Sequence, residues 1–91
     1  PYGDGKITFD KKMDRIFIGT STGELIVLDI KDFEILDREE ISETLIEDIF
    51  VYPRNNQLIV KSEYAVHVYN MFDEKIVASF DFDGRRSFGQ E

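Results

Sequence analysis

The chain holds a single histidine and no cysteine, so few of its residues could do acid–base or metal chemistry. His67 stands between Val66 and Val68, and because side chains alternate along a strand it should point to the face opposite those valines. A catalytic base needs a nucleophile or an orienting carboxylate within hydrogen-bond reach, and the sequence offers no plausible triad. One histidine also excludes the usual multi-histidine metal sites. We therefore predict a structural, hydrogen-bonded His67 and no enzymatic activity, cofactor or metal.

Two glycine-containing stretches partly fit ligand-binding motifs. In "DFDG", residues 81–84, a calcium loop aligned on Gly84 puts Asp81 and Asp83 at ligand positions. Ser79 then stands at the first ligand position, and Gln90 at the last, where a bidentate Glu is required. A turn that ends a strand explains Asp and Gly equally well. "YGDGK", residues 2–6, lacks the spacing and the preceding strand of a phosphate-binding loop.

The charge balance is strongly acidic, with 11 basic and 19 acidic residues and a net charge of −8. Such a surface repels phosphate backbones, which argues against a nucleic-acid partner. The densest acidic run lies at 37–48, and a basic protein partner is one reading of it, because complementary charge raises association rates. A solvated outer strand and loop is the other. The candidate protein-binding residues are Asp37, Glu39, Glu40, Glu43 and Glu47.

Short apolar runs separated by turn residues predict an all-β chain. Ile, Val, Phe and Tyr dominate these runs, as half-buried strands require. The turn signals include Pro53 with the following Arg-Asn-Asn, and Thr22-Gly23. The predicted strands are 6–10, 15–20, 24–30, 34–38, 48–52, 57–62, 65–70 and 75–82. An alternative remains at 36–49, where apolar residues at four-residue spacing also fit a helix.

The two halves of the chain align with each other. The matched pairs are Ile7 with Ile49, Ile16 with Leu58 and Ile18 with Val60 at an offset of 42, then Leu25 with Val66, Val27 with Val68, Asp29 with Asn70, Asp32 with Asp73 and Ile35 with Ile76 at an offset of 41. A period of this length is typical of β-propeller blades. Runs such as Leu25–Leu28 are apolar on both faces, as in sheets that are covered on both sides. We predict two four-stranded antiparallel blades at about 6–38 and 48–82, with a linker at 39–47 and a tail at 83–91.

The two units resemble degenerate tryptophan-aspartate (WD) repeats over about residues 6–82. "EDIFVYPRNNQLIV" is similar to the first half of such a repeat, with Asp48 before the strand and Pro53 in the turn. "LIVLD" and "VHVYN" are similar to the second half, with Asp29 and Asn70 where the terminal Asp stands. The resemblance implies a propeller that binds proteins through loop tips and blade edges.

The chain departs from the WD pattern at the buried hydrogen-bond network. Leu28 and Tyr69 replace the tryptophan, and the histidine of the loop between blades is missing. Thr20 and Ser62 occupy the hydroxyl position, but the network cannot be complete in either unit. "RIFIGTSTGELIVLDIKDFEIL" also resembles a quinoprotein-type propeller repeat, although Asp32-Phe33 replaces its Thr-Gly turn and its tryptophan is absent.

The predicted function is a non-catalytic protein–protein interaction scaffold, a WD-like segment of a larger protein or complex. The alternatives are a self-assembling two-blade unit, which would be a homo-oligomer, and a quinoprotein-type segment. Pro1 is not an initiator residue, so the chain is expected to come from a longer one. No membrane role is predicted, since the longest apolar run is far below the roughly 18 residues that span a bilayer. The lack of cysteine fits a reducing compartment, and we expect an intracellular protein, cytoplasmic or nuclear.

The energy of burying apolar surface also predicts that the two blades are only part of a larger propeller. A pair of blades shares one interface and leaves two faces bare, and neither end strand looks like a polar cap. A bare face of roughly 300–600 Å², at roughly 25 cal/mol per Å², represents on the order of 10 kcal/mol. The bare faces should include some of these side chains: Ile7, Phe9, Phe17, Ile26, Val51, Ile59, Val68 and Tyr69.

Overall fold

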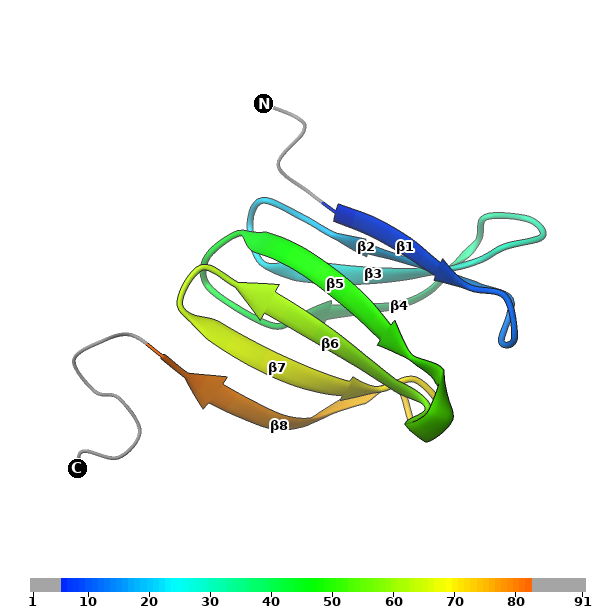
Figure 1. Cartoon of the computed structure of the whole chain (residues 1–91). Helices are drawn as coiled ribbons and strands as arrows, with labels where there is room; N and C mark the ends of the chain where they lie inside the picture. The colour runs from blue at the N-terminus through cyan, green and yellow to red at the C-terminus, as the bar shows by residue number, and fades with distance from the viewer. Residues whose placement is uncertain (1–5, 83–91) are drawn as a thin grey trace.

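Eight strands form two four-stranded antiparallel sheets in the computed structural model, which describes residues 6–82. Sheet 1 contains β1 (Lys6–Asp10), β2 (Arg15–Gly19), β3 (Glu24–Asp29) and β4 (Ile35–Glu40). Sheet 2 contains β5 (Ile46–Tyr52), β6 (Gln57–Ser62), β7 (Ala65–Asn70) and β8 (Lys75–Asp81), with a 3-10 turn, η1 (Pro53–Asn55), before β6. Each sheet has its strands in sequence order, and the two sheets lie against each other (Figure 1). The all-β prediction is confirmed.

The helical alternative for 36–49 is wrong, because this segment supplies strands to both sheets. Glu39 and Glu40 pair with β3, and Ile46 pairs with Ser62 of β6. Residues 41–45 join the sheets, so the connection is shorter than the predicted linker 39–47. No helix within residues 6–82 has the length and apolar character needed to cross a bilayer.

Tight turns close the hairpins at equivalent places in the two sheets. Asp14 and Asn56 adopt left-handed backbone at φ 57 and φ 57, conformations that short polar residues tolerate. Asp29 and Asn70 each end the third strand of their sheet. Each also accepts a hydrogen bond at its side-chain oxygen from a backbone amide two residues later. Such local bonds fix the direction of the turn and thus the register of the next strand.

The hydrogen-bond registers of the two sheets correspond position by position. Ile7 pairs with Ile18 in sheet 1, as Ile49 pairs with Val60 in sheet 2. The last two strands of each sheet shift register at one bulge, between Val27 and Leu28 in sheet 1 and between Val68 and Tyr69 in sheet 2. Residues at an offset of 42 in the first two strands, and of 41 in the last two, are called equivalent below.

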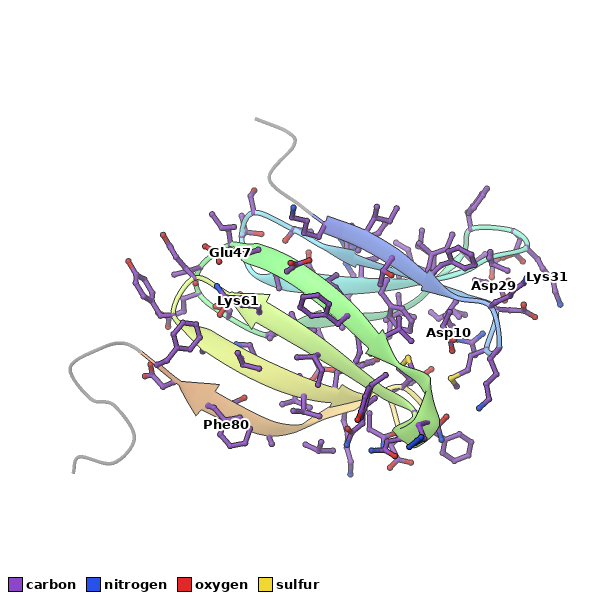
Figure 2. The ribbon with its side chains drawn as sticks, viewed as in Figure 1. Asp10, Asp29, Lys31, Glu47, Lys61 and Phe80 are labelled. Atoms are coloured by element: carbon purple, nitrogen blue, oxygen red, sulfur yellow. The ribbon has the colours of Figure 1, made fainter. Side chains whose placement is uncertain are left out.

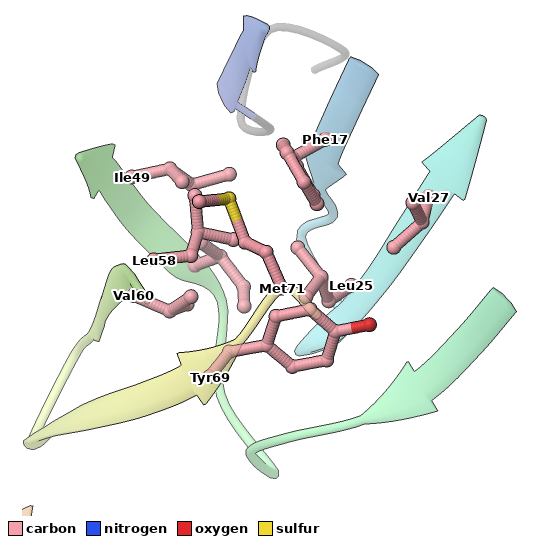
Figure 3. Close-up of a cluster of buried hydrophobic side chains, with 9 residues drawn as sticks. Phe17, Leu25, Val27, Ile49, Leu58, Val60, Tyr69 and Met71 are labelled. Carbon is pink, nitrogen blue, oxygen red and sulfur yellow. The ribbon is translucent and has the colours of Figure 1, made fainter. Parts of the chain in front are cut away.

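The core lies between the two sheets. The face that sheet 1 buries in the core is not the equivalent of the face that sheet 2 buries there. The inner face of sheet 1 carries Phe17, Leu25 and Val27, all buried. The inner face of sheet 2 carries the buried residues Ile49, Leu58, Val60, Tyr69 and Met71 (Figure 3). Phe17 packs edge-on against Tyr69, with ring centroids 6.4 Å apart. The inner face of sheet 2 is equivalent to the outer face of sheet 1, because Leu58 and Val60 are equivalent to Ile16 and Ile18.

The sheets approach most closely at β5, which contacts β1 and β2. Gly19 allows this approach: a Cβ atom there would lie 2.8 Å from the Cβ of Ile46 and 3.2 Å from Cδ1 of Ile49. No L residue with a side chain fits such a gap without displacing its neighbour. The sequence therefore places glycine where the side chain of Ile46 packs directly on the backbone of β2.

Candidate functional site

Two of the predicted protein-binding residues point into the molecule. Asp37 pairs with Val27 and Glu39 with Leu25, so both carboxylates share the inner face of sheet 1. The hydroxyl of Tyr69 donates a hydrogen bond of 2.9 Å to Oδ2 of Asp37. This bond joins β7 of sheet 2 to β4 of sheet 1. Asp37 thus serves the contact between the sheets.

The environment of this contact shifts two pKa values upward. The pKa of Tyr69 is raised by burial, and further by its hydrogen bond to Asp37 and the nearby carboxylate charges. The pKa of Glu39 is raised by burial and by the charge of Asp37, while a hydrogen bond with the backbone of Ile76 lowers it. Both shifts favour the neutral form of the side chain, because burial penalises a charge at this junction.

The other three acidic residues lie elsewhere. Glu40 and Glu43 are exposed and line a shallow hollow beside Ser42. Glu47 forms an ion pair with Lys61 on the neighbouring strand (Figure 2). The five residues therefore do not form one patch, and of the set Glu40 and Glu43 remain best placed to meet a partner. Binding by the five stays a prediction.

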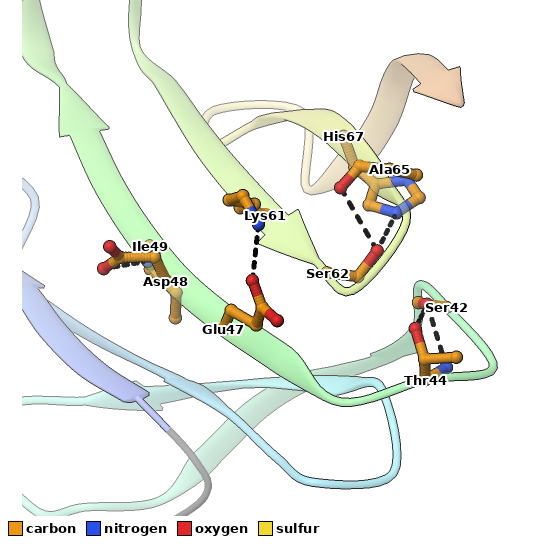
Figure 4. A network of polar contacts seen from close by, with 9 residues as sticks. All are labelled: Ser42, Thr44, Glu47, Asp48, Ile49, Lys61, Ser62, Ala65 and His67. Atoms are coloured by element: carbon orange, nitrogen blue, oxygen red, sulfur yellow. Dashed lines mark hydrogen bonds and ion pairs between the residues drawn. The ribbon is translucent and has the colours of Figure 1, made fainter. Parts of the chain in front are cut away.

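His67 is buried and hydrogen-bonded on the inner face of sheet 2, opposite the face of Val66 and Val68, as alternation predicts. Its Nδ1 lies 2.9 Å from the hydroxyl of Ser79, and its Nε2 lies 3.3 Å from the hydroxyl of Ser62 (Figure 4). Burial lowers the pKa of His67. The imidazole is therefore held in its neutral form over a wider pH range than a free histidine.

The hydrogen bonds around His67 also fix where its proton lies. The hydroxyl of Ser62 donates to the carbonyl of Ala65, 3.2 Å away. Nε2 of a neutral His67 must then carry the proton and donate to Ser62, while Nδ1 accepts from Ser79. In this arrangement His67 cannot take a proton from Ser62. Ser62 has local partners that the sequence analysis did not foresee, and Thr20 likewise accepts from the amide of Glu24 at 3.0 Å.

An open depression of about 350 Å³ lies beside His67. Its lining comes from the loop between the sheets, strands β6 and β7 with the turn between them, and β8. The lining residues are Ser42, Glu43, Thr44, Ser62, Tyr64, Ala65, His67, Ser79 and Asp81. The ring nitrogens of His67 and the hydroxyl of Ser62 are engaged within the protein, so these two side chains do not form a free acid–base pair.

The calcium-like stretch is only partly described. Asp81 ends β8, while Asp83, Gly84 and Gln90 lie outside residues 6–82, as do most of "YGDGK" and the predicted tail 83–91. Within residues 6–82 no three His, Asp or Glu side chains gather in a way that could hold a metal ion.

Each sheet has an outer face that no other part of residues 6–82 covers. The outer face of sheet 1 carries Ile7, Phe9, Ile16, Ile18, Ile26 and Leu28 on β1 to β3, with Ile7 69% and Phe9 54% exposed. Toward β4 the same face is charged, with Glu24, Arg38 and Glu40. The outer face of sheet 2 includes Phe50, Ile59, Val66, Val68 and Ala78, and Phe50 is 52% exposed. Phe80 of β8 shares this face and is 53% exposed (Figure 2). Phe17 and Tyr69, which were candidates for a bare face, are instead buried against each other.

No protein-family model matches the chain, and no curated protein matches it either. Its function must therefore be inferred from the geometry and chemistry of residues 6–82.

Proposed function

We propose that residues 6–82 are two successive blades of a WD-like β-propeller that acts as a non-catalytic protein-interaction scaffold. Further blades complete it, supplied by the same polypeptide or by other chains. The observation that carries the proposal is that the outer face of sheet 1 is equivalent to the inner face of sheet 2. Ile7, Ile16 and Ile18 are equivalent to Ile49, Leu58 and Val60, which are buried by a neighbouring sheet.

The arrangement of the strands supports the same proposal. Each sheet runs in sequence order, and the first strand of sheet 2 contacts the first two strands of sheet 1. Blades around a propeller axis have this order, with the first strand of each blade nearest the axis. Left-handed turn residues also recur at Phe33 and Glu74, with φ 61 and φ 60, at equivalent positions.

The free energy gained by covering the two bare faces favours a propeller with more than two blades. A four-stranded face of six residues per strand measures about 400 Å² at the usual spacings of about 4.8 and 3.3 Å. Covering one such face removes enough apolar surface to contribute on the order of 10 kcal/mol, as an upper estimate. That is comparable with the whole stability of a small domain. Repeat units of this kind gain much of their stability from neighbours.

Non-catalytic action is supported by the state of His67. Both ring nitrogens are used in hydrogen bonds to Ser62 and Ser79, and the proton positions do not favour activation of Ser62. A turnover by the purified chain that disappears in His67→Ala would contradict this part of the proposal. Glu40 and Glu43 are the acidic residues that we propose for contact with a basic partner.

The proposal is tested by joining copies of the chain head to tail in one polypeptide. The 14 residues outside 6–82 at each junction can span up to about 3.3 Å each, enough to connect the end of β8 to the next β1. One, two and three copies are compared by urea unfolding. We expect the midpoint to rise with copy number, because each junction covers two bare faces. Equal midpoints in all three proteins would show that the sheets do not stack as successive blades.

A further inference from the structure

The two outer faces of this chain are complementary to each other. Inside the molecule, the Phe17 face of sheet 1 packs on the Tyr69 face of sheet 2. The outer face of sheet 2 is the equivalent of the Phe17 face, and the outer face of sheet 1 is the equivalent of the Tyr69 face. Each chain therefore presents both halves of a contact that it already makes once internally.

We propose that the partner covering these faces is a second copy of this chain, bound head to tail. The outer face of sheet 2 of one copy packs on the outer face of sheet 1 of the next copy. The arrangement is like that of sheet 1 on sheet 2 within the chain, but the strands lie further apart beside Lys61, where a side chain takes the place of Gly19. This inference rests on the proposed function and deepens it by naming the occupant of the bare faces.

At the centre of the proposed contact, the side chains of both outer faces are smaller than the equivalent side chains of the internal contact. Phe17 and Tyr69 are a large aromatic pair at the centre of the internal contact. Their equivalents are Ile59 on the outer face of sheet 2 and Leu28 on the outer face of sheet 1. Two aliphatic side chains replace two rings, so neither a clash nor an unpaired ring results when these faces meet. The hydrogen bond of Tyr69 has no counterpart, because Leu28 has no hydroxyl to satisfy and Ala78 is equivalent to Asp37.

A second difference in size fits a groove. Phe50 on the outer face of sheet 2 is equivalent to Thr8 on the inner face of sheet 1 and is therefore much larger. The outer side of sheet 1 has an almost wholly apolar groove of about 260 Å³ beside β1. Its lining residues are Ile7, Thr8, Phe9, Ile16 and Ile30. In the proposed contact β1 takes the place of β5, so Phe50 of one copy lies over β1 of the next and its ring fills this groove.

Two charged residues, Lys61 and its cross-strand neighbour Asp48, lie on the outer face of sheet 2, and Lys61 is equivalent to Gly19. Its ammonium forms an ion pair with Glu47 on the neighbouring strand and lies 5.2 Å from the centre of the Phe82 ring. A lysine held in this way covers apolar surface with its stem while its charge stays in water. The contact can therefore form without burying an unpaired ammonium, with the two sheets held further apart beside Lys61 than at Gly19.

The contact is heterologous, because two different faces meet, and it extends from copy to copy until a ring closes or a chain grows. Each face offers about 400 Å² by strand spacing, below the roughly 800 Å² per partner of a standard interface. Association is therefore expected to be weak and visible only at high micromolar concentration. Added salt helps, since the repulsion between copies that each carry a net charge of −8 is largely screened beyond the Debye length of about 8 Å at 0.15 M.

Two variants of the full chain, each damaging one face, test the direction of the contact. Ile7→Asp damages the sheet 1 face, and Phe50→Asp damages the sheet 2 face; both residues are exposed in the chain. Phe72→Asp, at a 73% exposed turn position off both faces, is the control for the added charge. Analytical ultracentrifugation measures the mass from low to high micromolar protein in 0.15 M salt, and circular dichroism checks folding. Should Phe50→Asp not fold, Phe50→Ser replaces it.

The wild-type chain and Phe72→Asp should gain mass with concentration. Each face variant alone should stay a monomer, with association weakened at least tenfold. A mixture of the two should form a one-to-one dimer and stop there, because one intact face of each kind remains. Persistent self-association of either variant alone would mean that like faces meet, and would overturn the proposal. A monomeric wild-type chain, or a mixture that stays monomeric, would overturn it as well.

These outcomes separate the inference from the proposed function. If joined copies become more stable with copy number but separate chains do not associate, the blades stack and the partner is not a second copy. If joined copies gain nothing, the proposed function itself fails.

Discussion

Removing the hydroxyl of Tyr69 should weaken the tie between the two sheets while leaving their packing intact. Tyr69→Phe keeps a ring that is 0% exposed and packed edge-on against Phe17. It deletes the 2.9 Å hydrogen bond to Asp37. Hydrogen bonds to charged groups contribute about 1.5–3 kcal/mol. Asp37 is partly exposed and can recover water, so we expect a loss of about 1–2 kcal/mol in the free energy of unfolding.

A double-mutant cycle isolates this contribution. The wild-type chain, Tyr69→Phe, Asp37→Ala and the double variant are unfolded in urea and followed by circular dichroism, since the chain has no tryptophan. The second substitution should cost less in the presence of the first, with a coupling of about 1 kcal/mol, because only the first removes the shared bond. For a chain of this size the Tyr69→Phe midpoint should fall by about 1 M urea.

Alkaline pH offers an independent arm of the same test. The pKa of Tyr69 is raised by burial, and by its hydrogen bond to Asp37 and nearby carboxylates. An unfolded tyrosine ionises near pH 10, whereas the folded one resists ionisation. Tyr69 therefore contributes stability that is present below about pH 10 and is lost as the pH rises above it. Tyr69→Phe should lose less stability in that range. Additive substitutions, within about 0.3 kcal/mol, together with an unchanged alkaline slope would refute the reasoning.

Two further predictions concern the close approach of the sheets and the buried histidine. Gly19→Ala should cost about 1–3 kcal/mol by overpacking, because its Cβ would lie 2.8 Å from the Cβ of Ile46. Gly23→Ala should cost more, since φ is +90 there and the added atom meets the backbone carbonyl of Ser42; urea midpoints in the opposite order would contradict this. Burial lowers the pKa of His67, so its contribution is present above the unfolded pKa of about 6.5 and is lost as the pH falls below it. His67→Gln should flatten the decline in stability between about pH 6.5 and 5, and an unchanged decline would show that other groups cause it.

Local chemistry was enough to predict the strands. Turn residues such as Asn70 and Gly23 bracket the apolar runs, and the structure places all eight strands within about two residues of the predicted ranges. The β4–β5 region was the exception. Its apolar residues fit a helix by their four-residue spacing, and pairing with β3 and β6 decides in favour of strands. Such pairing depends on residues far away in the sequence.

The sequence could not say which face of each sheet is buried. Runs such as Leu25–Leu28 are apolar at every position, so alternation carries no signal there. The position of the neighbouring sheet decides which face is buried. It covers Phe17 in sheet 1, whereas the equivalent residue Ile59 in sheet 2 lies on the outer face. A chain that repeats one pattern and stacks it in one direction must bury opposite faces in successive sheets. The aligned sequence positions look alike, but their environments are reversed.

The acidic run shows the same limit for a candidate site. By composition, Asp37, Glu39 and Glu40 look like one negative surface, yet side chains in a strand alternate and the register with β3 turns Asp37 and Glu39 inward. Once inside, a carboxylate needs a donor, and Tyr69 provides one from the opposite sheet. A tyrosine in an apolar run is a possible signal for such a pair, since a buried hydroxyl also needs a partner. The partner of such a tyrosine could be identified only from the stacking of the sheets, because Tyr69 and Asp37 lie 32 positions apart in the sequence. Charges in a strand therefore divide between surface and interior by register, and only the outward ones, such as Glu40, are available to a partner.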